Sequence, residues 1–257
     1  MTSQTLDQTP GPTLDQTLDP PPTRGRATSA RSAAGWAGAC YVAIFVLAMF
    51  ANFLALDAVL QPGDATATAD ALREHDGMFR LGTTAFLGIF LADLVVAWAL
   101  YVLFRPTHRD LALAAAWFRI AYTVVLGAAL GLLYAALWLA DAPAELSGGA
   151  ADGGVLLALQ TFDFTWVMGL AAFGVHLVLV ARLLWMARGP RWIATLLALA
   201  GLGYALDTVA HIVLADYESY ATVFLAILAV PSIVGELSLA GWLMLVALGR
   251  RTAPAQA

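Results

Sequence analysis

Hydrophobic residues along the chain fall into six long runs separated by shorter polar stretches. Each run reaches the length of about 18 to 20 apolar residues that an α-helix needs to cross a bilayer. The predicted spans cover residues 34–60, 80–104, 110–140, 161–187, 191–214 and 221–249. The pattern therefore predicts an all-α, polytopic membrane protein: a bundle of six transmembrane helices.

Polar segments flank this bundle and divide the chain into three parts. Residues 1–32 contain TLDQT twice, then PPP, and few branched apolar or aromatic side chains, which predicts a disordered polar tail. Residues 33–250 form the predicted transmembrane domain, and residues 251–257 a short C-terminal tail. The first apolar run begins too late and is too long for a secretory signal peptide.

Arginine is concentrated in every second connection. Four regions are rich in it: the N-terminal tail, the turn FRPTHRD, the turn LLWMARGPRW and the C-terminus, whereas the other connections hold only Arg73 and Arg80. Because cytoplasmic loops carry an excess of basic residues, both termini are predicted to be cytoplasmic. We expect a bacterial cytoplasmic (inner) membrane protein whose main partner is the lipid bilayer. The outer connections PGDATATADALREHDG and DAPAELSGGAADGG are predicted to be loops rich in Gly and Asp.

Composition agrees with a membrane location. Hydrophobic residues make up 61% of the chain and charged residues only 12%, about half of the roughly 25% typical of soluble domains. A net charge of −5 argues against a nucleic-acid partner. The single cysteine, Cys40, allows neither an internal disulfide nor a cysteine-based metal site. Nothing in the sequence requires a cofactor or identifies a protein partner.

Ionisable residues inside the spans are the candidate functional groups, since such residues are rare in membranes and usually have partners. At about 1.5 Å rise per residue, four of them lie between roughly 14 and 21 Å from the cytoplasmic helix ends. This predicted intramembrane cluster consists of Asp93, Arg119, His176 and Glu236.

Arg119 needs an acidic partner to offset the cost of its burial, and either Asp93 or Glu236 lies within reach. Tyr122, one turn along the same helix face, can add a hydrogen bond. Two interpretations remain: a structural ion pair that fixes helix register, or a charged site that binds an anionic group or relays protons.

Asp207 and His211 lie four residues apart on the fifth span, a spacing that can ligate a metal. A third ligand has to come from Asp57, Asp163 or the loop that holds His75. The alternative is a pair of polar groups hydrogen-bonded to each other near the outer interface.

Two further features concern helix geometry. Pro231 and Gly235 lie just outward of Glu236 and predict a kink in the sixth span. Gly127 and Gly131 form a GxxxG pattern in the third span, which is typical of close helix packing.

The segments GVHLVLVARLL, GPRWIATLLALAGLGYALD and VGELSLAGWLML resemble an uncharacterised bacterial membrane family, domain of unknown function 4386. The matching positions are a fourth-span histidine, an Arg/Pro turn, a Gly-rich fifth span and a Gly-Glu pair before a Trp-Leu segment: His176, Pro190, Gly201, Gly203, Gly235, Glu236 and Trp242. Arg119 fits the third-span arginine of the family, and the resemblance favours Glu236 as its partner. It covers roughly residues 33–250 and implies six helices but no activity.

Three classes of function are consistent with the sequence. A structural or accessory membrane protein needs its polar groups only for packing. A transporter of a small solute, or a proton-coupled permease, uses the Arg/Glu/Asp/His cluster in mid-membrane. A membrane-embedded metalloenzyme uses Asp207 and His211. Whether the protein is an enzyme is left open.

Overall fold

Six membrane-length helices dominate the computed structural model, which describes residues 28–141 and 149–254. The chain runs through α1 (Ala30–Met49), a π-helical segment (Phe50–Leu56), α2 (Ala65–Glu74), α3 (Asp76–Phe104), α4 (Arg109–Ala140) and α5 (Gly149–Met186). It continues through α6 (Arg191–Val213), a short 3-10 turn (Tyr217–Ser219) and α7 (Ala221–Ala247). All helices except α2 and the 3-10 turn belong to candidate spans, so the all-α, six-span prediction is confirmed.

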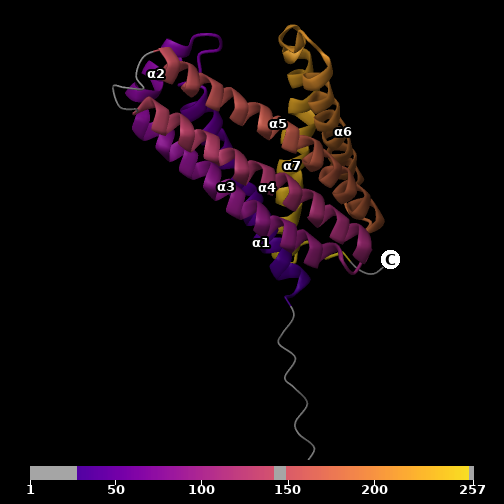
Figure 1. Cartoon of the computed structure of the whole chain (residues 1–257). Helices are drawn as coiled ribbons and strands as arrows, with labels where there is room; N and C mark the ends of the chain where they lie inside the picture. The colour runs from indigo at the N-terminus through magenta and orange to yellow at the C-terminus, as the bar shows by residue number, and fades with distance from the viewer. Residues whose placement is uncertain (1–27, 142–148, 255–257) are drawn as a thin grey trace, which may run out of the picture.

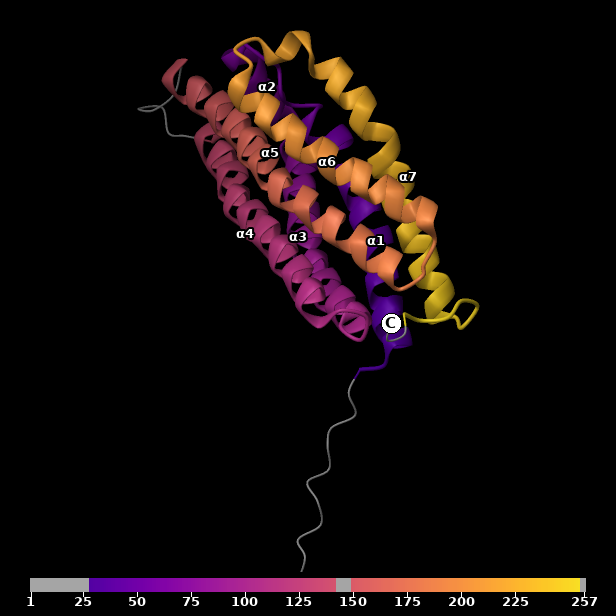
Figure 2. The ribbon, with the colours of Figure 1, turned by 90° about the vertical axis from the view of Figure 1, so that its right-hand side faces the viewer.

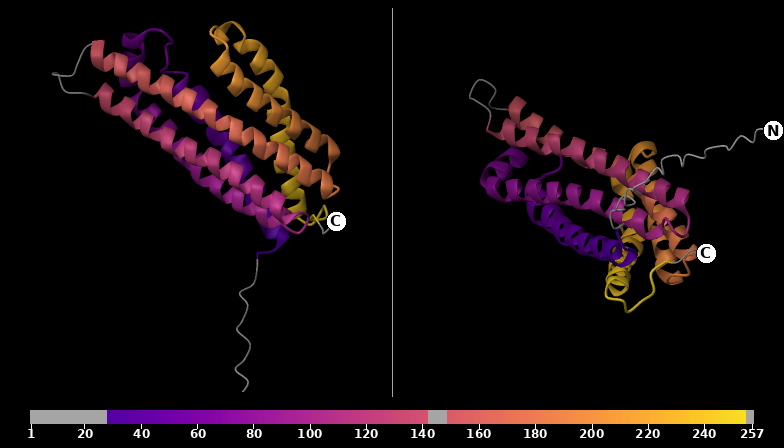
Figure 3. Two further views of the ribbon diagram at one scale, coloured as in Figure 1. Left: turned by 45° about the vertical axis from the view of Figure 1, so that its right-hand side comes forward. Right: turned by 90° about the horizontal axis from the view of Figure 1, so that it is seen from below.

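The six spans form a ring in sequence order. Each packs against the next along the chain, and α7 packs against α1 to close the ring. Figure 1 shows α3, α4 and α5 running side by side, with the α6–α7 pair crossing them at an angle. The two views of Figure 3 show α7 beside α1 near the C-terminal end of the described chain. The ring therefore encloses one interior that every span faces.

Two segments predicted as loops are helical instead. Residues 65–74 form α2, because the Asp64 carboxylate caps the first turn by accepting a hydrogen bond from the Ala67 amide (2.9 Å). The helix buries Leu72 against the bundle. Residues 149–160 extend α5 beyond its predicted start at residue 161, and Val155 and Leu159 of this part are fully buried. Local capping and core burial thus override the Gly- and Asp-rich composition of both segments.

Arg73 joins these two added helical parts. Its guanidinium binds Asp70 (2.8 Å), Asp152 (2.7 Å) and the carbonyl oxygen of Ala140 (3.1 Å). The hydrogen bond to Asp152 raises the pKa of Arg73 above its ordinary value. These contacts tie α2, α4 and α5 together at the end of the bundle opposite the arginine-rich connections.

The ends of the chain are only partly described. The predicted disordered tail, residues 1–32, lies mostly outside the described residues, and its last three residues already belong to α1. Residues 251–254 of the predicted C-terminal tail follow α7 as non-helical chain.

Glycines allow a close helix crossing between α5 and α6. A Cβ atom added at Gly174 would collide with the carbonyl oxygen of Gly201, and one added at Gly201 would collide with that of Gly174. In the predicted GxxxG pattern, Gly127 faces the ring of Phe90, whereas nothing lies within 4 Å of a Cβ at Gly131. The pattern therefore accounts for one close contact, and the tighter crossing comes from Gly174 and Gly201.

Substituting Gly174 with alanine should lower the thermal unfolding temperature of the purified protein in detergent. The added methyl group meets backbone rather than a flexible side chain, and overpacking of this kind costs about 1–3 kcal/mol. Gly131→Ala is the matched control, because its methyl group enters open space and alanine favours the helix. Equal unfolding temperatures for the two variants would contradict the crossing.

Candidate functional site

Arg119 lies in the interior of the ring and is almost completely buried, with 1% of its surface exposed. It comes from the middle of α4, where its own turn is anchored by a hydrogen bond from the Thr123 hydroxyl to the Arg119 carbonyl oxygen (2.8 Å). A buried guanidinium carries five N–H donors that must find acceptors inside the protein. The site is built around those donors.

Asp93 of α3 is the ionic partner of Arg119. Nη2 of Arg119 donates to Oδ1 of Asp93, and both side chains are fully buried. The sequence resemblance favoured Glu236 as the partner, and this prediction is wrong. Asp93 is on the helix that directly precedes α4 and packs along it, which brings its short side chain to the level of the guanidinium.

Two further side chains accept hydrogen bonds from Nη1 of Arg119. The hydroxyl of Tyr41 on α1 lies 2.9 Å away, and Nε2 of His176 on α5 lies 3.1 Å away. The aromatic rings of Tyr41 and Phe173 lie close to the guanidinium carbon, at 4.8 and 5.4 Å between that carbon and the ring centroids. Four helices thus meet at one cation.

The contacts of His176 define its protonation state. Its Nδ1 lies 2.8 Å from the carbonyl oxygen of Ala115, which can only accept, so Nδ1 carries the hydrogen. Nε2 faces the Arg119 guanidinium, which can only donate, so Nε2 is the acceptor. His176 is therefore a neutral imidazole with a fixed tautomer, and it is a hydrogen-bond partner of Arg119 rather than a second cation.

Tyr122 does not bind Arg119, contrary to prediction. Its hydroxyl accepts a hydrogen bond from Nε1 of Trp166 (3.2 Å), and its ring packs against Phe173 at 5.0 Å between centroids. Tyr41 and Phe173 take the role at the guanidinium instead. Neither residue carries a specific signal in the sequence, because aromatic residues are common throughout the spans.

Glu236 on α7 stands apart from the hydrogen-bonded group. It is half-buried and forms neither a hydrogen bond nor an ion pair with any residue that the structure describes. It interacts electrostatically with Arg119, Asp93 and Tyr41 across the ring interior. Arg119 also has one unpartnered atom. Among the described residues, its Nε is the buried side-chain donor that has no acceptor.

Asp207 and His211 form a separate group near the far end of α6. Asp207 accepts a hydrogen bond from the Tyr217 hydroxyl (2.7 Å), and Nδ1 of His211 lies 3.6 Å from the Asp207 carboxylate. The imidazole stacks on the Tyr217 ring at 3.5 Å between centroids. Within residues 28–141 and 149–254, no group of three or more His, Cys, Asp or Glu side chains is placed to hold a metal ion. The predicted third ligands thus do not join this pair.

Comparison with known proteins places this chain in a family. The family model described as "Domain of unknown function (DUF4386)" matches residues 36–247, so the chain belongs to that family, as its motifs predicted. A curated relative, an uncharacterized protein of Archaeoglobus fulgidus, is 26% identical over 165 residues, which are 63% of this chain and 82% of the relative. No solved structure shows significant similarity to the chain.

A double-mutant cycle tests the central pair. Arg119→Met and Asp93→Asn should each lower the free energy of unfolding in detergent by about 3–5 kcal/mol, because each leaves a buried polar partner unmatched. The double variant should lose clearly less than the sum of the two. The parallel cycle of Arg119→Met with Glu236→Gln should show a smaller coupling, since no hydrogen bond joins those residues. Additive losses in the first cycle would contradict the pairing.

Proposed function

We propose that this member of the DUF4386 family is a small-solute transporter driven by protons, with Glu236 as the proton-carrying group. The observation that carries the proposal is the environment of Glu236. A carboxylate halfway along a membrane span, with no hydrogen-bond partner among the described residues, can bind and release a proton without breaking a hydrogen bond.

Arg119 supplies the fixed positive charge that Glu236 faces. In the resting arrangement Asp93, Tyr41 and His176 hold its guanidinium, while its Nε–H remains free among the described residues. When Glu236 loses its proton, the attraction between its carboxylate and the guanidinium grows, which draws α7 toward the fixed Arg119–Asp93 pair. In this proposal the Arg119–Asp93 pair has a structural role, and Glu236 binds and releases the proton.

The packing of α7 supports the idea that part of this helix moves during transport. Every buried residue of α7 lies at or beyond Ser232, so the half of the helix before this position has little contact with the core. Pro231 lies at the boundary and removes one backbone hydrogen bond to the preceding turn. Figure 2 shows α7 bending along its length, as the sequence predicted. The outer half of α7 is suited to swing about Pro231, next to Glu236.

For the location, we propose the cytoplasmic membrane, with both termini in the cytoplasm and the lipid bilayer as a partner. Arg73 and Arg80, at the opposite end, are paired with Asp70, Asp76, Asp141 and Asp152. At the end of the bundle that carries the arginine-rich connections, the described arginines form no salt bridge. Their positive charge is therefore not balanced by acidic side chains, which supports a cytoplasmic placement of this end. The acidic net charge supports the absence of a nucleic-acid partner.

Reconstituted vesicles test the transport proposal. The purified chain in proteoliposomes that enclose a pH-sensitive dye should show proton movement when one member of a panel of amino acids, sugars, carboxylic acids and amines is added. Glu236→Gln should reduce this movement at least about tenfold, the effect of removing an essential proton carrier. Its unfolding temperature should stay close to that of the wild type, because the substitution breaks no hydrogen bond.

Glu74→Gln is the matched control, since Glu74 is an exposed carboxylate at the end of α2. It should transport as the wild type does. Wild-type vesicles that behave like empty liposomes with every solute class would overturn the proposal, as would full activity in the Glu236→Gln variant.

The metalloenzyme hypothesis stays a prediction with weaker support, because Asp207 is already bound by Tyr217. Elemental analysis of the purified protein separates it from transport. Near-stoichiometric zinc or iron that disappears in His211→Ala would bring the enzyme hypothesis forward. We expect no such metal in either sample.

A further inference from the structure

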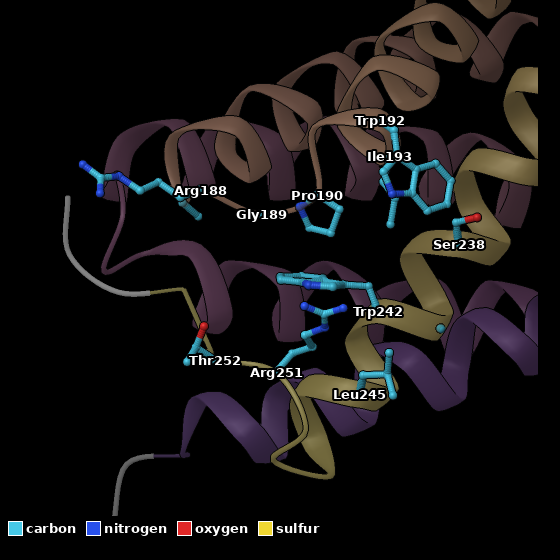
Figure 4. Close-up of a pocket in the computed structure, with 12 residues that line it drawn as sticks. Arg188, Gly189, Pro190, Trp192, Ile193, Ser238, Trp242, Leu245, Arg251 and Thr252 are labelled. Atoms are coloured by element: carbon cyan, nitrogen blue, oxygen red, sulfur yellow. The ribbon is translucent and has the colours of Figure 1, made fainter.

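A pocket of about 640 Å³ opens at the arginine-rich end of the bundle. It lies between the turn that joins α5 to α6 and the C-terminal end of α7, away from the Arg119 cluster. Figure 4 shows its walls: Pro190 and Trp192 on one side, and Ser238, Trp242, Arg251 and Thr252 on the other. Among the residues that the structure describes, no aspartate or glutamate lines this pocket.

Two helix ends of the same type hold the walls in place. α7 ends in a Schellman motif, in which Gly249 has a φ of 72° and the Arg250 amide binds the Leu245 carbonyl oxygen (2.9 Å). This motif folds the chain back, so that Arg251 lies over the last turns of α7. α5 ends in the same way with Arg188 at a φ of 55°, and the Gly189 amide binds the Leu184 carbonyl oxygen (2.9 Å).

The chemistry of the pocket favours an anion. In Figure 4 the Arg251 side chain points into the pocket beside the Trp242 ring, whereas the Arg188 guanidinium points away. Arg251 forms no salt bridge with any residue of the described chain. The hydroxyl groups of Ser238 and Thr252 add polar partners, and the first turn of α6, capped by no side chain, lies in the same wall. The unneutralised guanidinium of Arg251 matches the acceptor oxygens of a phosphate group, and Ser238 and Thr252 are polar residues of the same lining.

The position of the pocket favours a lipid as the source of that phosphate. Trp185 and Trp192 are 45% and 57% exposed at this end, as expected for indole rings at headgroup level. Basic pockets between transmembrane helices on the cytoplasmic side are suited to anionic headgroups. Trp192 also offers apolar ring surface to the glycerol and upper acyl region.

We propose that this pocket binds a phosphate group, supplied by an anionic phospholipid headgroup, with Arg251 as the charged anchor. The inference does not depend on the proposed transport. It assigns a role to Arg251 and to the turn between α5 and α6, which have no part in the proposed transport.

Thermal unfolding of the full-length protein in detergent, with added phosphatidylglycerol, tests the proposal. The wild type should gain stability with phosphatidylglycerol but not with phosphatidylcholine. Arg251→Gln should weaken the apparent affinity for phosphatidylglycerol about tenfold, as expected for the loss of one charged hydrogen-bond donor. Arg250→Gln removes the same charge from the neighbouring residue, which does not line the pocket, and should bind as the wild type does.

A parallel titration with inorganic phosphate separates the two sources of the ligand. Stabilisation by phosphatidylglycerol alone identifies a lipid headgroup. Equal stabilisation by inorganic phosphate, lost in Arg251→Gln, identifies a soluble phosphate compound in the same pocket. The proposal is overturned if the protein shows no preference for anionic over neutral lipid and no effect of phosphate. It is also overturned if Arg251→Gln and Arg250→Gln lose the same affinity for phosphatidylglycerol.

Discussion

The burial of one arginine governs the middle of this protein. A guanidinium removed from water needs acceptors on several sides, and no single neighbouring helix can provide them. Asp93 neutralises the charge, and Tyr41 and His176 accept from a second nitrogen. Because these three residues come from α3, α1 and α5, the four helices must hold one register relative to each other. A ring in sequence order brings these spans to a shared interior.

Around this fixed centre, the two sides of the ring differ in how firmly they are held. The ion pair joins α3 to α4, the packing of Tyr122 on Phe173 joins α4 to α5, and Arg73 of α2 binds both α4 and α5. α7 contributes no hydrogen bond to Arg119, and its first half buries no residue. The half-buried Glu236 is therefore on the least constrained span, facing the most constrained residue. This contrast suits a protein whose work requires one side to move while the other keeps its geometry.

The sequence predicted the elements whose signals are strong and local. Runs of apolar residues gave six spans, and Arg119, Asp93 and His176 were recognised because charges and imidazoles are rare in such runs. The acidic partner of Arg119 was harder to predict. The helical rise places Asp93 and Glu236 at similar depth, but it does not show which helices are neighbours. Tyr41 was missed because an aromatic side chain in an apolar helix carries no distinctive signal. α2 was missed because its Asp64 cap and buried Leu72 are hidden in a segment of loop-like composition.

The position of the ion pair on consecutive spans also bears on how the chain enters the membrane. α3 and α4 are joined by only the short turn at residues 105–108, so they can insert together as a helical hairpin. A lone arginine or aspartate at the centre of an inserting helix costs about 2.5–3.5 kcal/mol. A hairpin that already holds Arg119 against Asp93 presents a neutral pair to the lipid. Insertion of α3 and α4 as a pair therefore has a lower free-energy cost than insertion of either helix alone.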